Sequence, residues 1–185
     1  MTRDEAWSIL TEFTKSDSLL KHAIAVEAAM RHYAVHFGQD VEKWGLVGLL
    51  HDFDYERWPE PPEHTRAGAS ILRTRGLDEE IITAILSHAD WNQEQYPLDS
   101  LLRRTLYAVD ELCGFIMAVA YVQPERLNGM TPSSVRKKMK QKAFAAAVSR
   151  EAIEKGAALL NLPLDDHIQH VITAMQSVSR NLGFQ

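Results

Sequence analysis

The sequence predicts an all-α fold, a helical bundle that forms a single domain. Three observations lead to this prediction. Hydrophobic residues recur at helical spacing along the 185 residues, most helical stretches are bounded by a capping or helix-breaking residue, and no period-2 run of β-branched residues predicts a strand. Apolar residues make up 45% of the chain and charged residues 24%, which is typical of a globular protein and not of a disordered one.

The predicted helices follow one another from end to end. Thr2 can cap a first helix of about ten residues, and Ser16 or Ser18 can cap a second over 19–37, which Gly38 ends. The prolines of the loop DFDYERWPEPPE exclude helix there. Further helices are expected over 41–51, 63–75, 78–89, 99–122, 132–146, 149–161 and 164–182.

The charge is unevenly spread along the chain. The net charge of −5 disfavours bulk nucleic acid as a partner. The segment Thr131–Arg150 nevertheless carries six cationic side chains and no acid. Subtracting this +6 segment from the total leaves −11 on the other 165 residues.

The location of the protein is predicted from what the chain lacks. A single cysteine, Cys113, excludes an internal disulfide and favours a reducing compartment. The longest apolar run, Leu112–Val122, is too short to span a bilayer, and the first residues have no apolar signal region. We therefore expect a cytoplasmic protein with no membrane partner.

The dipeptide His51-Asp52 closes an apolar helix, GLVGLLHD, and both side chains are good ligands for a divalent cation. Neighbours on a helix point about 100° apart, so further ligands must come from facing helices. His22 lies beside the apolar stripe of the second helix. Asp110 lies in the most apolar helix, where an ionised carboxylate is costly unless it is paired or bound to a metal. These four residues form a His–His–Asp–Asp set that leaves coordination positions open for water and substrate.

This pattern resembles the HD-domain (HDIG-like) metal-dependent phosphohydrolase superfamily, and the whole chain is similar to a small bacterial subgroup of it. His22 before apolar helical residues, then LLHDFDYE, EHTRAGA, SHAD and AVDELCGFI, carry the resemblance. It implies an all-α domain over 1–185, with a metal-binding core over about 17–122 and a C-terminal helical extension over about 131–185. By motif it implies four primary metal ligands, which are His22, His51, Asp52 and Asp110.

The resemblance also bears on His64 and His88. In superfamily members with two metals, histidines at these two positions ligate the second ion and the HD aspartate bridges both ions. The implied cofactor is therefore one or two divalent ions per chain, of Mn, Fe, Ni, Co, Zn or Mg. Many such members have paired histidines at the second position, whereas Ala89-Asp90 follows His88 here. A hydrogen bond to substrate or to a neighbouring helix stays open as an alternative for both histidines.

Asp54 and Glu56 are the candidate catalytic carboxylates beside Asp52. In some members a carboxylate just past the HD pair positions or deprotonates the attacking water, which requires hydrogen-bond reach. Members with a single metal often place it three residues past the aspartate, and Tyr55 occupies that position here. The role is therefore not assigned to one of the two, and a solvated acidic loop is the alternative.

Three cations of the basic segment are the candidate substrate-binding residues. Lys138 and Lys142 follow one face of the helix expected over 132–146, and Arg150 comes one loop later. A phosphate substrate needs cations beyond the metal, so we predict an anion clamp from these three residues. The alternative is a solvated helix face.

Four other histidines carry less of the prediction. His32 and His36 are spaced i, i+4, which could clamp a metal on a helix face, but no carboxylate motif supports them. We expect an exposed helix face for this pair, and a similarly incidental place for His167 and His170.

The sequence as a whole predicts a divalent-metal-dependent hydrolase of a phosphate ester or anhydride in a small phosphorylated metabolite or nucleotide. The expected reaction is in-line attack by a metal-bound hydroxide. Two other functions stay open: a di-iron oxygenase on the same scaffold, which requires that His64 and His88 both ligate, and a non-catalytic metal- or nucleotide-binding regulator. A homodimer also stays open.

Overall fold

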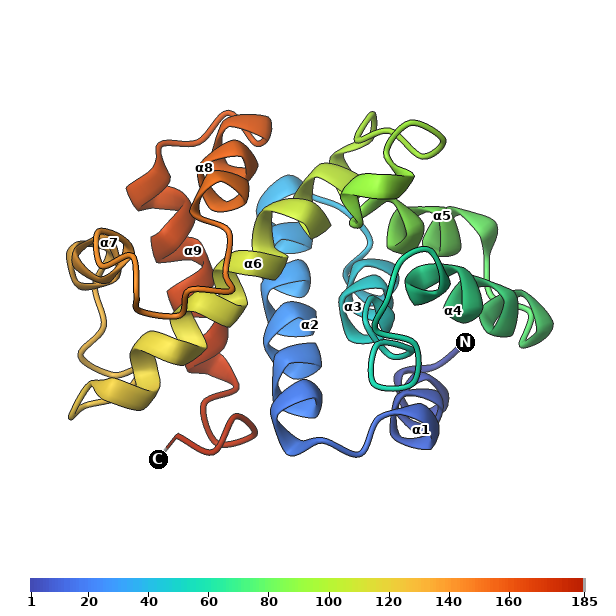
Figure 1. Ribbon diagram of the computed structural model, residues 1–185, viewed down its shortest axis with the longest axis horizontal. Helices are drawn as coiled ribbons and strands as arrows, with labels where there is room; N and C mark the ends of the chain where they lie inside the picture. Colours follow the sequence, from blue (N-terminus) through green and yellow to red (C-terminus); the bar gives the residue numbers. More distant parts are fainter. Residues whose placement is uncertain (185) are drawn as a thin grey trace.

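The computed structural model describes residues 1–184, which form helices joined by turns and short loops, with no strand among these residues (Figure 1). The helices are α1 (Arg3–Phe13), α2 (Asp17–Phe37), α3 (Val41–Leu50), α4 (Glu63–Thr74), α5 (Glu79–Ser87), the 3-10 helix η1 (Asp90–Asn92), α6 (Leu101–Val122), α7 (Pro132–Met139), α8 (Arg150–Leu159) and α9 (Leu164–Ser177). The all-α prediction is confirmed.

Several helix ends are fixed by the residues that the sequence indicated. The Thr2 hydroxyl accepts from the backbone N–H of Glu5, whose carboxylate accepts from the Thr2 N–H, so that a capping box begins α1. Asp78 and Ser100 cap α5 and α6 by accepting backbone N–H groups. Gly38 ends α2 with a φ of 65°, in the left-handed region that favours glycine.

The C-terminal third departs from the predicted boundaries. The helix expected over 132–146 ends at Met139, and turns follow it. Lys138 and Lys142 would lie one turn apart in a longer helix, and like charges at that spacing destabilise helices. Lys142 therefore does not share a helix face with Lys138, contrary to the prediction. Helix α9 also stops early, at Ser177.

Helix α2 lies at the centre of the bundle (Figure 1). It packs against α3 on one side and α9 on the other, and α6 crosses it. Helix α8 packs on α6, and α4 packs on α5. The C-terminal helices are therefore held on the N-terminal half through α2 and α6.

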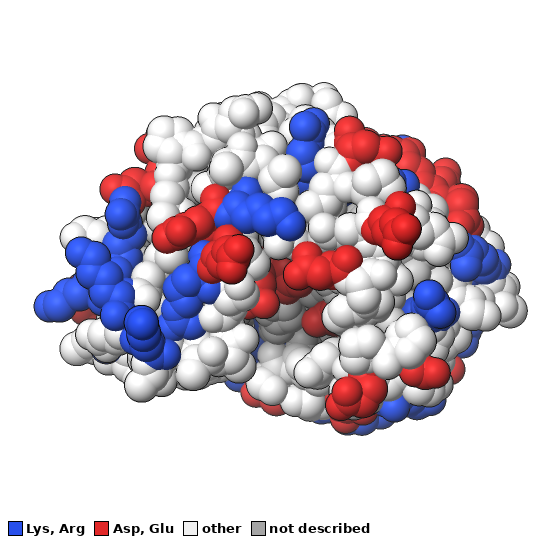
Figure 2. Space-filling view, turned by 45° about the horizontal axis from the view of Figure 1, so that its top comes forward, with Lys and Arg blue, Asp and Glu red and all other residues white. Residues whose placement is uncertain are grey.

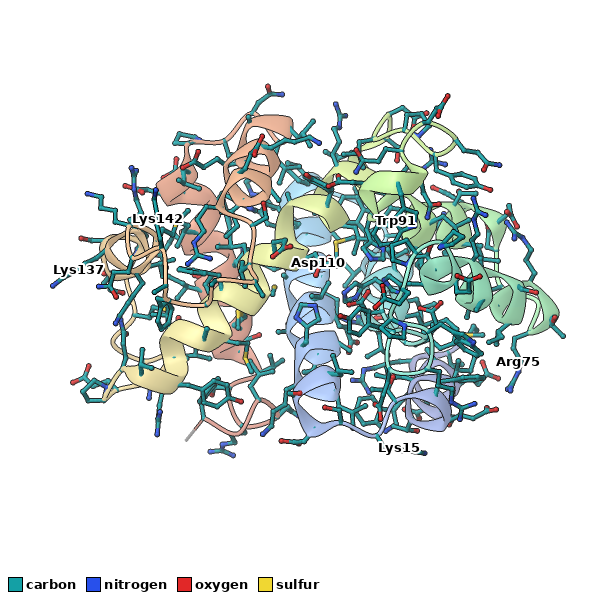
Figure 3. The ribbon with its side chains drawn as sticks, viewed as in Figure 1. Lys15, Arg75, Trp91, Asp110, Lys137 and Lys142 are labelled. Atoms are coloured by element: carbon teal, nitrogen blue, oxygen red, sulfur yellow. The ribbon has the colours of Figure 1, made fainter. Side chains whose placement is uncertain are left out.

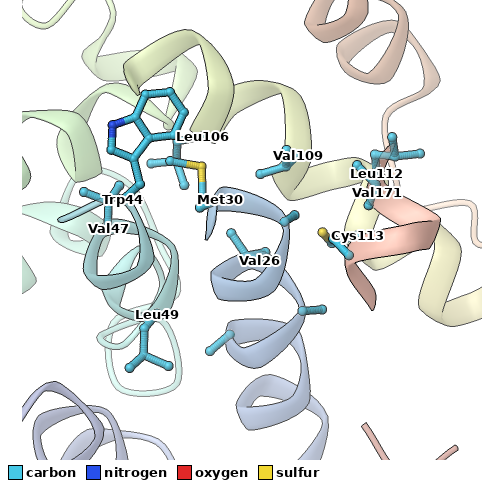
Figure 4. Close-up of a cluster of buried hydrophobic side chains, with 14 of the residues drawn as sticks. Val26, Met30, Trp44, Val47, Leu49, Leu106, Val109, Leu112, Cys113 and Val171 are labelled. Carbon is cyan, nitrogen blue, oxygen red and sulfur yellow. The ribbon is translucent and has the colours of Figure 1, made fainter. Parts of the chain in front are cut away.

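The core is formed where α2, α3 and α6 meet (Figure 4). Val26 and Met30 of α2, Val47 of α3 and Leu106 of α6 are completely buried, and Trp44 of α3 is nearly so. Burial of such side chains stabilises the fold by about 1.5–3 kcal/mol each. The polar residues described next are anchored to this rigid packing.

Helix α6 is 22 residues long, twice the apolar run noted in the sequence, and its length and composition would suffice to cross a membrane. Within its most apolar stretch, however, 67% is buried inside the protein. It contacts α2, α5, α8 and α9. This is the burial of a core helix packed between its neighbours.

Candidate metal centre

Six side chains that the sequence singled out converge where α2, α3, α4, α5 and α6 meet. They are His22, His51, Asp52, His64, His88 and Asp110. Ligand atoms of the first three lie within 4.8 Å of one another, and so do those of Asp52, His64 and His88. The Oδ1 atom of Asp110 lies 3.0 Å from Nε2 of His22 and 3.4 Å from Nε2 of His51. Asp52 therefore belongs to two adjacent groups of candidate metal ligands.

The surroundings of Asp52 fit a cation. Its Oδ1 atom is buried and has no hydrogen-bond partner, although Nε2 of His64 and Nε2 of His88 each lie 3.2 Å away. A buried carboxylate oxygen without a partner is costly. A divalent ion coordinated by the carboxylate and the two imidazoles would remove that cost, because all three are ligands of such ions.

The Nδ1 atoms of His51 and His88 are each occupied by a backbone carbonyl, which fixes the tautomer of the neutral ring. Nδ1 of His51 donates to the carbonyl of Gly48 at 2.8 Å, and Nδ1 of His88 donates to the carbonyl of Ile85 at 2.6 Å. A carbonyl can only accept, so in the neutral form of each ring the lone pair is on Nε2, which faces the centre. This arrangement is typical of metal-binding histidines.

Nδ1 of His64 is bound by the carboxylate of Asp54, whereas Nδ1 of His51 and of His88 is bound by a backbone carbonyl. The buried carboxylate of Asp54 accepts from Nδ1 of His64 at 3.0 Å and from the backbone N–H groups of Thr65 at 2.9 Å and Gly68 at 2.8 Å. Thr65 has a φ of 69°, unusual for a β-branched residue. The amide of Asn92 donates to its hydroxyl at 2.8 Å. Asp54 thus positions His64 and the start of α4, and this geometry favours a positioning role over the catalytic role considered for it.

Glu56 lies outside the centre. Its Oε2 atom accepts from the backbone N–H groups of Lys15 at 2.7 Å and Ser16 at 3.0 Å, in the turn between α1 and α2. The side chain is exposed. The structure therefore gives Glu56 a role in holding that turn and does not bring it to the predicted catalytic position.

A pocket of about 360 Å³ opens beside the centre. His88 and Asp110 line it together with Trp91, Tyr107 and Lys155. Asp90, Glu111 and Glu151 add three carboxylates to its wall. Figure 2 shows acidic side chains gathered around a hollow in the middle of this face, and basic side chains gathered at one end of the molecule. The candidate centre is therefore accessible to a small molecule.

The three cations predicted as an anion clamp do not line this pocket. Nζ of Lys138 lies 4.9 Å from the centre of the Phe144 ring, and the Arg150 guanidinium donates to backbone carbonyls of its own segment and lies 4.6 Å from the Phe115 ring. In Figure 3, Lys142 lies at the α7 end, well away from Asp110.

The cation that lines the pocket is Lys155 of α8, whose Nζ lies 4.6 Å from the centre of the Tyr107 ring. A single lysine on an amphipathic helix leaves no pattern in the sequence. Only the packing of α8 on α6 places it beside Asp110.

The charges of the centre stabilise one another. Burial alone would lower the pKa of His51, but the carboxylates of Asp52 and Asp110 outweigh it and raise this pKa. Burial likewise opposes the effect of Asp52 and Asp54 on His64, whose pKa rises to about 9. The pKa of Asp110 is lowered, because the neighbouring His51 and His22 outweigh the effect of its burial. A metal ion binding here must displace protons from the imidazoles.

Residues 19–118 match the family model described as HD domain. The chain belongs to the HD-domain family. Two curated relatives are ribonuclease Y of Nitratidesulfovibrio vulgaris (strain DP4), 33% identical over 103 residues, and regulatory protein RecX of Mycobacterium leprae (strain Br4923), 34% identical over 87 residues. The matches cover 54% and 43% of this chain but only 18% and 51% of the relatives. No solved structure matches.

The family match confirms the resemblance drawn from the motifs and supports metal-dependent phosphohydrolase chemistry at the level of the superfamily. The match spans α2 to α6 almost completely, so it contains all six converging side chains. Helices α8 and α9 lie outside it, and so does Lys155.

Proposed function

We propose that this protein is a divalent-metal-dependent hydrolase of a phosphate ester or anhydride in a small phosphorylated metabolite or nucleotide. The observation that carries the proposal is the shared carboxylate of Asp52, which joins two groups of ligands beside an open pocket. One group consists of His22, His51 and Asp52, with Asp110 adjacent, and the other consists of Asp52, His64 and His88.

The divalent ions, when bound, would acidify water and neutralise charge on a phosphoryl group. The chain's own side chains supply the rest. Lys155 can donate a charge-assisted hydrogen bond to a phosphate oxygen. Trp91, whose ring lies 5.9 Å from that of His64, and Tyr107 offer aromatic faces to the organic part of the substrate. The surrounding carboxylates disfavour a substrate with several unneutralised negative charges.

The test is phosphate release from a panel of phosphorylated metabolites with manganese, cobalt, nickel, iron or magnesium, after measurement of bound metal. We expect the Asp52→Ala variant to lose hydrolysis and bound metal while its circular dichroism spectrum stays that of the wild type. Full activity and full metal content in that variant would contradict the proposal.

The role of Lys155 in substrate binding is tested with a matched pair of lysine variants. Lys155→Gln should raise the KM for a phosphorylated substrate at least about tenfold, the value of one charge-assisted hydrogen bond. Lys142→Gln removes the same charge from the α7 end of the molecule and should leave KM unchanged. Equal KM values for the two variants would exclude Lys155 from substrate binding.

A second candidate, a di-iron oxygenase, is favoured by one observation. Such a site requires that His64 and His88 both ligate, and both lie 3.2 Å from Asp52 Oδ1. Two irons per chain together with oxygen uptake on a substrate would support it, and phosphate release without oxygen uptake would exclude it. Tight nucleotide binding without turnover would instead support a regulator.

A cytoplasmic location and a bacterial source stay predictions. A homodimer stays open.

A further inference from the structure

The four histidines outside the metal centre gather where α9 packs on α2. His167 is completely buried, where an exposed or incidental position was expected. Its Nε2–H donates to the carbonyl of Ala108 at 3.0 Å, and its Nδ1 accepts from the hydroxyl of Tyr33 at 2.6 Å. His167 is therefore a core residue that joins α9 to α2 and α6.

The other three histidines lie nearer to solvent and face one another. Nε2 of His32 and Nδ1 of His170 are 2.9 Å apart, and the ring centres of His36 and His170 are 4.6 Å apart. Two nitrogens at this distance share a single proton. Burial, together with the neighbouring imidazoles, lowers the pKa of His32 and His170, which favours the neutral form of both rings.

We propose that His32, His36 and His170 form a second metal site, for a transition-metal ion with a preference for imidazole such as Zn²⁺. Two histidines one turn apart on a helix form a recognised chelating pair for zinc. His32 and His36 have this spacing on α2, and His170 reaches them from the facing helix. The site is separate from the HD centre and does not depend on the proposed hydrolase function.

The distances suit a tetrahedral ion. With Zn–N bonds of roughly 2.0–2.1 Å, two imidazole nitrogens on one zinc ion lie roughly 3.3 Å apart. The 2.9 Å between His32 and His170 is close to this value, so an ion can replace the shared proton with a small outward movement of the rings. Among the described residues, only the groups of the HD centre have all their ligand atoms within 4.8 Å of one another. His32, His36 and His170 do not form such a group as they stand, so the exposed ring of His36 has to turn to complete the site.

The fourth position can be filled by water or by Asp166, which lies one turn before His170 on α9 and is exposed. An ion bound there would tie α9 to α2. Binding to the folded state alone would raise the stability of the protein with zinc concentration.

The test uses full-length protein whose HD centre has first been saturated with metal, titrated with zinc chloride at pH 7.5. Bound zinc per chain and the imidazole ¹⁵N resonances are measured for the wild type and for two ligand variants, His36→Gln and His170→Asn. Gln169→Ala is the matched control, because Gln169 is an exposed neighbour on α9. His36 is itself exposed, so His36→Gln keeps the fold even if His170→Asn does not.

We expect the wild type and Gln169→Ala to bind one more zinc ion per chain than His36→Gln and His170→Asn. We also expect zinc to shift the resonances of His32, His36 and His170 in the wild type. The proposal is overturned if all four proteins bind the same amount of zinc. It is also overturned if zinc shifts only the histidine resonances of the HD centre.

Discussion

The conversion of Asp54 to asparagine separates a positioning role from a catalytic one. In the structure, Oδ2 of Asp54 accepts from the backbone N–H groups of Thr65 and Gly68, while Oδ1 accepts from Nδ1 of His64. An asparagine of the same shape can keep its oxygen on the two backbone donors. Its NH₂ group then faces Nδ1 of His64, where a second donor is not tolerated.

His64 responds by changing its tautomer. Nδ1 accepts from the asparagine amide, and the proton moves to Nε2, which faces Asp52. In that form Nε2 has no lone pair for an ion. The affinity for the second ion should fall about 10–100-fold, as for other changes behind a metal-binding histidine, while the group of His22 and His51 keeps its affinity.

Asp54→Ala gives the contrasting result. It leaves two buried N–H groups without partners, at about 1–3 kcal/mol each, so that the free energy of unfolding falls by about 2–6 kcal/mol. Asp54→Asn keeps those two bonds and should cost about 1 kcal/mol. Urea unfolding measures the stability of both variants, and calorimetric titration with Mn²⁺ measures both metal affinities.

Glu56→Gln is the matched control, because Glu56 contacts the turn between α1 and α2 and lies outside the centre. It should change neither metal affinity nor hydrolysis. The reasoning is refuted if Asp54→Asn binds two ions as tightly as the wild type. If it does so and yet loses hydrolysis, Asp54 acts as the general base instead.

Two further predictions concern the core. The pKa of His167 is lowered by burial from its ordinary 6.5 to about 4, so the unfolded chain binds a proton that the folded chain rejects. The free energy of unfolding should therefore fall by about 3 kcal/mol as the pH is lowered from 6.5 to 4. In urea unfolding, the His167→Gln variant should lose about 3 kcal/mol less than the wild type over this range. Parallel pH profiles of the two proteins would contradict this. A Cβ at Gly48 would lie 2.8 Å from the Val26 carbonyl, so Gly48→Ala should lower stability by about 1–3 kcal/mol and displace His51. Gly114→Ala, where a Cβ meets nothing within 4 Å, is the control and should raise the melting temperature slightly, and equal melting temperatures would refute the packing argument.

The sequence by itself determined the helices and the chemical type of the centre. Local signals were sufficient for the helix ends, because a cap such as Thr2 or Ser100 acts within one turn of its own position. They failed over 140–146, where the helical spacing continues but the chain forms turns and Ala145 has a φ of 45°. A histidine and an aspartate at the end of an apolar helix are costly to bury unless they are paired or bind a metal, so the metal motif could also be predicted from the sequence.

Only the tertiary structure decided which side chains meet. All eight histidines lie in or beside helices, yet four face the HD centre and four meet between α2 and α9. The basic segment was the conspicuous charge cluster in the sequence, but the pocket takes its cation from Lys155, a lysine with no pattern around it. Helical periodicity states which face of a helix is apolar and leaves open which helix will cover it. The packing of α8 and α9 on α6 and α2 supplies that answer, because burial of their apolar faces fixes where every polar neighbour points.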